Sequence, residues 1–484
     1  MGQPFIIVME GDPPSDGEAI SGLVHGLFAG SGEVPEFIVC THLPKPPRLT
    51  PPEWWMSTRR GYIFLDFSEP PGMYALARLL RLVQIQNAFV RHKPQEVASY
   101  IRHTGIHRIV LLMDGNHDLI LYAAKLLRLI PEVPASLYVG SEPLGYLRFY
   151  RNPFSKRRIS RSFEYLLRRC DPRYVGNELI RSLYEERFGI TFGVHLPPVR
   201  DEYFREFSAK EPPQLKMDAG LRVFVSGSMH KYLNNSIQCL GRAFSRAAGE
   251  LGQSPKLVFC GNWTSERLQE QGFAPEQLEG LGRLPSEWHV IEQASQAGCA
   301  FIGDMFDLPA GEVPTFLPSR MSDYLIAGSP IIALSFQNSA LANYFKRLDL
   351  PLLCEGLNEQ ALAALLVRVA RLTGDERKAM RQRYLSVLER FHLASRMRAE
   401  LLGQHPNETV ADGEAQLRMS LCEIGSKEEE EDAWMPPVSQ FAKWQRLIPT
   451  LARMHIINPI RSSLKRIPLV HSAYKSLQSL MRTR

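Results

Sequence analysis

The sequence predicts an α/β protein with two domains, each built on a doubly wound parallel sheet. Short apolar runs alternate with amphipathic helical segments over two separate stretches, which is typical of parallel strands covered by helices on both faces. A polar, proline-rich segment divides the two stretches. The length of 484 residues suits two or three domains, and the 44% apolar and 22% charged content is that of a soluble globular protein.

Each stretch contains its own series of elements. In the first, strands are predicted at 5–9, 37–40, 62–65, 108–113, 135–139 and 174–175, with helices at 19–29, 73–91, 95–103, 119–129, 162–169 and 178–188. In the second, strands are predicted at 221–227, 256–262, 299–304, 331–335 and 351–356, and helices at 236–251, 288–297, 320–327, 340–347 and on to about 402. Ligands of such sheets bind at the carboxyl ends of the strands, so the cleft between two facing domains is the expected site.

Composition excludes several classes of protein. No apolar run approaches the ~18 residues of a membrane span, and the N-terminus reads as a first strand and not as a signal peptide. The seven cysteines are scattered without metal-ligand spacing, which favours small buried side chains in a reducing compartment. We therefore expect a cytoplasmic protein, peripheral at the inner face of the membrane.

Several segments together resemble a known family. The opening VMEGDPPSDGEAISGLVHGLFAG, the segment CDPRYVGNELIRSLYEERFGITFGVHLPPV, the strand and loop LRVFVSGSMHK, and LGRLPSEWHVIEQASQAGCAFIGD follow in the family's order. The most specific match is LPSRMSDYLIAGSPIIA, which is similar to the donor-binding segment of that family. The chain resembles glycosyltransferases with the GT-B architecture of two facing Rossmann-like domains, of the retaining family 4 type, over about residues 1–402.

The resemblance assigns roles to the parts of the chain. It implies an acceptor-side Rossmann-like domain at 1–205, a linker at 206–220 and a nucleotide-sugar donor domain at 221–404. An acidic, disordered linker is predicted at 405–436 and a basic, amphipathic helical tail at 437–484.

Donor-binding residues are expected around the second domain's first loop and the LPSRMSDY helix. Gly227 permits close approach of the backbone to a diphosphate, and Lys231 is either a phosphate ligand or a solvated lysine. Arg320 can bind phosphate in a bidentate manner. Ser319 is either a donor contact or the N-cap of the helix, and Asp323 is either the ribose ligand or a carboxylate that favours the helix dipole.

The acceptor side offers weaker candidates. Gly17 lies in a loop that approaches the sugar from the first domain, or in a plain turn. Glu142 and His117 follow two strand ends, where the family places an acid or a histidine near the sugar, although His117 also suits the start of a helix. The family's second donor glutamate is replaced by Thr315.

The resemblance implies transfer of a hexose from a nucleotide-diphosphate sugar to a saccharide or lipid-linked acceptor in polysaccharide biosynthesis, with retention. Such an enzyme orients its substrates and stabilises charge, and needs no cofactor. No DxD segment occurs, so no metal is expected. The alternatives are a catalytically degenerate GT-B protein that acts as a binding or assembly module, favoured by Thr315 and the short Asp323, and an epimerase of the same fold.

Two basic segments predict a surface partner. Residues 148–169 hold eight Lys/Arg against one acid, and 433–484 hold nine Lys/Arg and no acid, so the net charge of +6 resides in the tail. Both are interleaved with aromatic residues, which favours an anionic membrane surface, although a solvated helix face fits 148–169 equally. Nucleic acid is not expected, because no recognised module is present.

Overall fold

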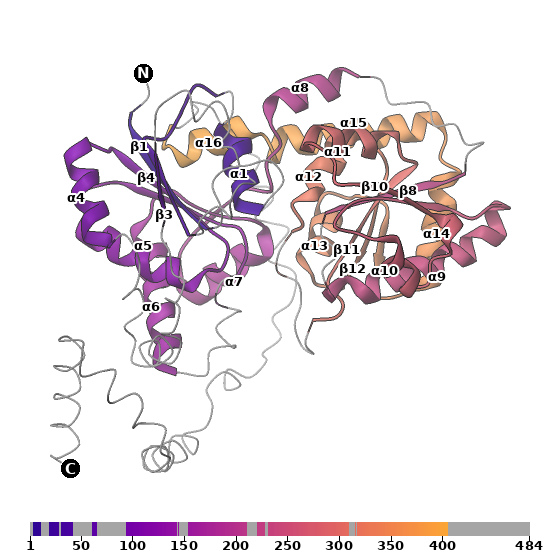
Figure 1. Cartoon of the computed structure of the whole chain (residues 1–484), viewed down its shortest axis with the longest axis horizontal. Helices are drawn as coiled ribbons and strands as arrows, with labels where there is room; N and C mark the ends of the chain where they lie inside the picture. The colour runs from indigo at the N-terminus through magenta and orange to yellow at the C-terminus, as the bar shows by residue number, and fades with distance from the viewer. Residues whose placement is uncertain are drawn as a thin grey trace, which may run out of the picture. The chain divides into compact units, whose positions relative to one another are not determined.

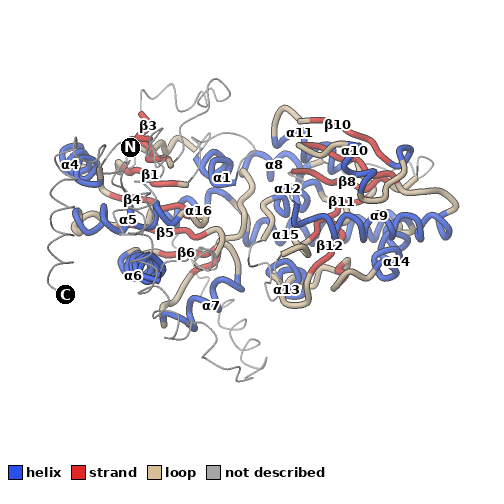
Figure 2. The backbone as a smooth tube through the Cα atoms, turned by 60° about the horizontal axis from the view of Figure 1, so that its bottom comes forward, coloured by secondary structure: helices blue, strands red, loops and turns tan. Residues whose placement is uncertain are grey.

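The computed structural model describes residues 3–10, 19–28, 31–41, 61–64, 93–142, 144, 153–210, 220–227, 231–308, 315 and 317–404. Two parallel sheets with helices on both faces form what we call the N-terminal and C-terminal lobes (Figures 1 and 2). The predicted fold class is thereby confirmed for these residues. The predicted helix at 73–91, the acidic linker and the basic tail lie outside them.

The N-terminal lobe contains a seven-stranded sheet in the order β3-β2-β1-β4-β5-β6-β7. Every pair of neighbours in it is parallel. The strands are β1 (Phe5–Met9), β2 (Phe37–Cys40), β3 (Gly61–Phe64), β4 (Arg108–Met113), β5 (Ala135–Val139), β6 (Arg173–Val175) and β7 (Gly193–Val194). Because the strand order reverses between β1 and β4, the loops after these two strands flank the point where doubly wound sheets bind ligands.

Alternating side chains of this sheet face two different helical layers. On β1, Ile6 and Val8 enter one apolar core, while Phe5, Ile7 and Met9 enter the other, as the period of two in a strand requires. The first core is closed by α4 (Pro94–Thr104), α5 (His117–Leu129), α6 (Pro153–Arg169) and α7 (Glu178–Phe188). The second is closed by α1 (Ala19–Phe28) and α16 (Ala394–Leu401).

The C-terminal lobe repeats this plan with six parallel strands in the order β10-β9-β8-β11-β12-β13. They are β8 (Arg222–Gly227), β9 (Lys256–Gly261), β10 (Leu278–Gly282), β11 (Cys299–Gly303), β12 (Ile331–Ser335) and β13 (Leu353–Glu355). One face packs on α9 (Asn234–Leu251), α10 (Ser265–Glu270) and α14 (Glu359–Ala370). The other packs on α8 (Asp201–Ala209), α11 (Glu287–Gln296), α12 (Arg320–Ala327), α13 (Ala340–Arg347) and α15 (Gly374–Phe391). Here the strand order reverses between β8 and β11.

Some elements were not predicted. Helix α8 lies in the segment that was expected to be an irregular linker, although its Tyr203 and Phe207 are spaced for one buried helical face. Strands β7 and β10 are short and contain glycine, and β10 lies at the edge of its sheet. Helix α6 begins at Pro153, nine residues before the predicted start.

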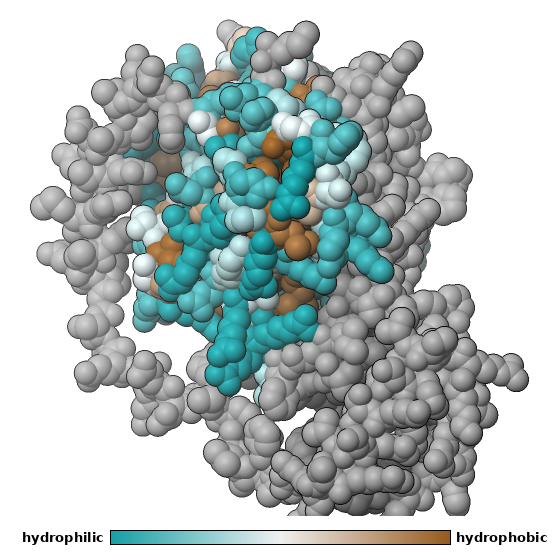
Figure 3. All heavy atoms as spheres, turned by 90° about the vertical axis from the view of Figure 1, so that its left-hand side faces the viewer, coloured by the Kyte–Doolittle hydropathy of each residue, from teal (hydrophilic) through white to brown (hydrophobic). Residues whose placement is uncertain are grey.

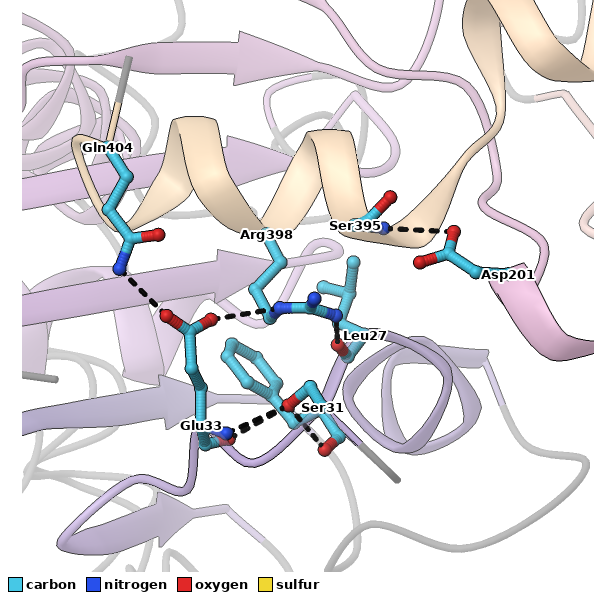
Figure 4. Close-up of polar contacts among 8 residues, drawn as sticks. Leu27, Ser31, Glu33, Asp201, Ser395, Arg398 and Gln404 are labelled. Carbon is cyan, nitrogen blue, oxygen red and sulfur yellow. Dashed lines mark hydrogen bonds and ion pairs between the residues drawn. The ribbon is translucent and has the colours of Figure 1, made fainter. Parts of the chain in front are cut away.

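The chain crosses between the lobes twice, and the two crossings touch. Val199 on the outward path donates its N–H to the carbonyl of His392 on the return path at 2.7 Å, and its own carbonyl accepts from the N–H of Ala394 at 3.0 Å. After the return, α16 packs on the N-terminal sheet. Arg398 of α16 is bound to Glu33 at 2.9 Å and to the carbonyl of Leu27 at 2.6 Å (Figure 4).

The surface, the helices and the cysteines can be compared with what the composition predicted. The side of the N-terminal lobe seen in Figure 3 is largely hydrophilic, with hydrophobic atoms between the polar side chains. In the described part of the chain, no helix is long and apolar enough to cross a membrane. The six cysteines described are free and buried, as predicted, and Cys422 lies outside the described residues.

Candidate functional site

The switch point of the C-terminal sheet is built on two glycines. Gly227 ends β8 with a φ of 108°, and Gly261 ends the neighbouring β9 with a φ of 105°. A Cβ at Gly261 would stand 2.2 Å from the carbonyl oxygen of Gly227, so no larger residue fits there. Both positions need the left-handed backbone that glycine adopts without strain. Gly227 therefore ends β8 in a conformation that glycine favours, and its role in donor binding stays a prediction.

The first turn of α12 lies beside this glycine. A Cβ at Gly227 would lie 3.9 Å from Nε of Arg320, which places the guanidinium next to the end of β8. Helix α12 is fixed to the same strand end by Tyr324, whose hydroxyl accepts the N–H of Ser226 at 2.8 Å. The structure thus brings together Gly227, at the end of β8, and Arg320, in the first turn of α12, two of the residues that the sequence predicted for donor binding.

Arg320 and Asp323 form an ion pair within this turn. Nη1 of Arg320 donates to Oδ2 of Asp323 at 2.8 Å, and the side chain of Asp323 is only 3% exposed while that of Arg320 is 26% exposed. Burial alone lowers the pKa of Arg320, but the neighbouring carboxylate of Asp323 raises it above its usual value. The guanidinium is therefore a permanent positive charge that is held by the buried Asp323 and is partly exposed to solvent.

Of the remaining predicted donor residues, the structure describes Ser319 but not Gly17 or the side chain of Lys231. Ser319 occupies the N-cap position of α12, but its side chain makes no capping hydrogen bond, so the predicted cap is wrong. Its carbonyl instead accepts from the hydroxyl of Ser322 at 2.9 Å. Lys231 begins a short 3₁₀ turn (Lys231–Leu233) at the start of α9, and its side chain lies outside the described part, as does Gly17. Their roles stay predictions.

Two charged residues of this site were missed by the sequence. Glu287, the first residue of α11, lies close enough to Asp323 for the two carboxyl groups to interact. Nε of Arg200, at the N-terminus of α8, lies 3.7 Å from Oε2 of Glu287. Burial and the negative charge of Asp323 raise the pKa of Glu287. The predicted helix began one residue later, at 288, and neither residue carries a local pattern that reveals a partner so distant in sequence.

The switch point of the N-terminal sheet carries a second acidic group. The carboxylate of Glu10, directly after β1, accepts the N–H groups of Asp114 at 3.0 Å and Asn116 at 2.8 Å in the loop after β4. Burial, and then the charge of Glu10, raise the pKa of Asp114 to about 6. Glu10 was not among the predicted residues. Its carboxylate fixes the loop that leads into α5.

The two predicted acceptor-side residues lie at neighbouring strand ends. His117 is buried and is the first residue of α5, as its alternative interpretation expected. Glu142 follows β5 and is partly buried, and its charge contributes to raising the pKa of Tyr184 in α7. Because β4 and β5 are adjacent and parallel, both residues lie at the carboxyl edge of the N-terminal sheet. A catalytic role for either stays a prediction.

Thr315 contacts the other lobe. Its carbonyl accepts from Nδ2 of Asn177 at 2.7 Å, and Oδ1 of the same asparagine caps α7 by accepting the N–H of Ile180 at 3.1 Å. The side chain of Glu178 also reaches across to Arg347 of α13. The N-terminus of α7 is therefore a contact between the lobes, and its partner Thr315 lies just before the predicted donor segment.

The fold can be compared with known proteins. No family model and no curated protein sequence matches the chain. Among solved structures, the UDP-forming α,α-trehalose-phosphate synthase from Burkholderia xenovorans in complex with glucose-6-phosphate is 12% identical, with a TM-score of 0.53 over 83% of this chain and 99% of that one. The N-terminal domain of trehalose-6-phosphate phosphatase from Candida albicans is 9% identical, with a TM-score of 0.54 over 84% and 97%.

A third solved structure, the Anabaena protein HepE in complex with UDP and glucose, is 10% identical, with a TM-score of 0.50 over 83% of this chain and 100% of that one. At such identities the likeness concerns the fold alone. The likeness covers most of the chain and agrees with two parallel sheets that share one strand order. The chain has the GT-B fold.

Proposed function

We propose that the chain is a retaining GT-B glycosyltransferase of the family 4 type. It transfers a hexose from a nucleotide-diphosphate sugar to a saccharide or lipid-linked acceptor, without a metal ion. The C-terminal lobe binds the donor, and the carboxyl edge of the N-terminal sheet, with Glu142 and His117, faces the transferred sugar and the acceptor. The boundaries 1–205 and 221–404 are proposed for the two functional domains, except that α8 packs with the C-terminal lobe and α16 with the N-terminal lobe.

One observation carries this proposal: Arg320 lies beside Gly227 at the switch point of the C-terminal sheet. A glycine with an open backbone and a fixed, permanently charged guanidinium match the demands of a diphosphate, which accepts N–H donors and bidentate guanidinium contacts. Asp323 holds the guanidinium in place. Its side chain is only 3% exposed, so its proposed role as the partner of the ribose hydroxyls requires the turn to open when the donor binds. UDP is the first nucleotide to test, because HepE was solved with UDP and glucose.

The direct experiment is a thermal-shift panel of nucleoside diphosphates and their sugars, followed by an assay of transfer or hydrolysis in the presence of excess chelator. We expect one base to raise the melting temperature and its sugar nucleotide to react. A panel without any shift would contradict donor binding. Loss of the reaction in chelator, with recovery on adding manganese, would contradict the metal-independent mechanism.

Substitution of Arg320 tests whether this side chain, which lies beside Gly227, binds the diphosphate. Arg320→Ala removes a charged hydrogen-bond donor from the site, so we expect nucleotide binding to weaken by about 1–3 kcal/mol. The measurement is calorimetric titration with UDP. Arg371→Ala is a suitable control, because its side chain is 65% exposed and it lies in the same lobe. Equal affinity of Arg320→Ala and the wild type, with both folded, would dismiss Arg320 as a ligand.

A second function is favoured by Thr315. It stands where the family has a second donor glutamate, and its carbonyl is occupied by Asn177 of the other lobe. A GT-B protein that has lost activity would not turn over a sugar nucleotide. It would serve as a binding or assembly module. UDP binding without reaction of any sugar nucleotide would select this alternative.

A further inference from the structure

We infer that Glu287 is a positioning residue of the donor site, which fixes Asp323 and Arg320 and joins them to Arg200 at the crossing between the lobes. The inference rests on the proposed function and adds to it a residue that neither the sequence pattern nor the family resemblance assigns. Glu287 acts through other side chains and does not itself contact the nucleotide.

The geometry forms a continuous chain of four charged groups. Arg200 pairs with Glu287 at 3.7 Å, and Asp323 accepts from Arg320 at 2.8 Å. The carboxyl groups of Glu287 and Asp323 lie close enough to interact, which joins the two pairs. Arg320 in turn lies against Gly227. The four side chains come from the N-termini of three helices, α8, α11 and α12, so the chain joins elements that are far apart in sequence.

Packing around the chain keeps these helix ends together. Trp288, next to Glu287, packs its ring against Tyr203 at 5.4 Å and Phe207 at 4.5 Å between ring centroids, which fixes α11 against α8. The guanidinium of Arg200 lies 4.9 Å from the ring centroid of Tyr203. The carboxyl of Glu287 therefore has a defined position between Arg200 and Asp323. A displacement of α8 would move Arg200 and Glu287, and so change the position of Asp323.

Arg200 connects these four charged side chains to the crossings between the lobes. It directly follows Val199, which is hydrogen-bonded to both neighbours of Leu393 on the return crossing. A movement of one lobe relative to the other must bend the backbone at these crossings. The ion pair of Arg200 with Glu287 thus lies between the crossing and the donor site.

The protonation state of Glu287 sets the net charge of the group. With Glu287 protonated, the two arginines and Asp323 leave one positive charge next to the predicted diphosphate site. Burial and Asp323 hold the pKa of Glu287 well above its usual range, so this state persists near neutral pH. Ionisation at higher pH cancels the positive charge, and an anion binds less tightly.

The two arginines near Glu287, Arg200 and Arg320, stay charged between pH 7 and 9, because a guanidinium is effectively always protonated in proteins. Burial raises the pKa of Tyr324 to about 12 and that of Cys260, at the end of β9, to about 11. A loss of affinity in this interval that is absent in Glu287→Gln therefore reports on Glu287.

The test is calorimetric titration of the full chain with UDP at pH 7 and pH 9, using the wild type, Glu287→Gln, Glu287→Ala and Glu292→Gln. Glutamine keeps a neutral hydrogen-bond donor, so we expect Glu287→Gln to bind UDP as the wild type does at pH 7 and to keep that affinity at pH 9. The wild type should lose affinity several-fold at pH 9. Glu287→Ala should bind about tenfold more weakly at both values. Glu292→Gln, on the same helix, should follow the wild type.

The outcomes separate the inference from the proposed function. If the wild type binds UDP and Glu287→Ala binds it equally well, Glu287 has no positioning role. The same conclusion follows if Glu287→Gln and the wild type show one pH profile, a comparison that remains informative should Glu287→Ala fail to fold. A folded wild type that binds neither UDP nor any other nucleoside diphosphate of the panel would overturn the donor-site assignment, and with it this role of Glu287.

Discussion

The buried side chain of His392 has its tautomer fixed by its hydrogen-bond partners and its neutral state fixed by burial. Its Nδ1 lies 2.6 Å from the carbonyl oxygen of Pro197, which can only accept, so Nδ1 must carry the proton. In the neutral ring Nε2 then accepts from the hydroxyl of Tyr344 at 2.8 Å. Burial lowers the pKa of His392 to about 4, which keeps the imidazole neutral at the crossing between the lobes.

This histidine predicts a loss of stability in mild acid. Its folded-state pKa lies below the unfolded value of 6.5, so the unfolded chain binds more protons as the pH falls from 6.5 towards 4. The free energy of unfolding should therefore fall by about 2 kcal/mol between pH 7.5 and pH 5 through this residue. Urea denaturation at the two pH values measures the effect.

Two variants isolate this contribution. His392→Gln should be less stable at pH 7.5 but lose less on acidification, because it has no proton to gain. His103→Gln, which changes an exposed histidine of α4, should show the slope of the wild type. A slope for His392→Gln equal to that of the wild type would mean that His392 is not the acid-sensitive group.

The residues of the donor site were predictable only where the signal was local. Arg320 and Asp323 lie in one helical turn and match a family segment, and Gly227 ends an apolar strand, so the sequence placed all three near each other. Glu287 and Arg200 reach the same site only through the packing of α11 and α8. No periodicity records such pairings, and the same holds for Glu10, which contacts a loop about a hundred residues further on.

At the scale of elements, the alternation of strands and helices was enough to predict both sheets. Elements with weak local signals were missed: β10 contains two glycines, and α8 is flanked by prolines that favour a loop. The position of α16 was also beyond the sequence. It follows the last helix of the C-terminal lobe in the chain, yet Met397 and Leu401 are buried against the N-terminal sheet.

The ion pair that fixes α16 should contribute more than an exposed pair of the same geometry. Arg398 and Glu33 are 17% and 25% exposed, and a double-mutant cycle with Arg398→Met and Glu33→Gln should give a coupling free energy of about 1–2 kcal/mol. Arg102 and Glu132 form a matched control, with the same 2.9 Å distance between the same types of atom but 53% exposure on both sides. Equal coupling in the two pairs would show that burial of α16 does not strengthen its ion pair.

At the scale of the whole molecule, the two lobes follow one strand order, and contacts at element ends hold them together. The crossings meet at Val199 and His392, α16 binds the N-terminal sheet, and the first turn of α7 reaches the donor segment at Thr315. A donor bound to the C-terminal lobe must be met by the edge of the N-terminal sheet. We therefore expect the contacts at α7 to help fix the distance between the two halves of the proposed active site.

Asn177 allows this contact to be broken without loss of its helix cap. In Asn177→Asp, a carboxylate oxygen still accepts the N–H of Ile180, since aspartate is a good N-cap, but no amide remains to donate to Thr315. We expect the distance between spin labels on the two lobes to become more broadly distributed, and the KM for the sugar nucleotide to rise. The melting temperature should fall as well, because the new carboxylate is buried and faces the carbonyl of Thr315. Asn358→Asp is the matched control, because Asn358 caps α14 in the same way, within the C-terminal lobe. If both variants keep the distance distribution of the wild type, the bond between Asn177 and Thr315 does not hold the lobes together.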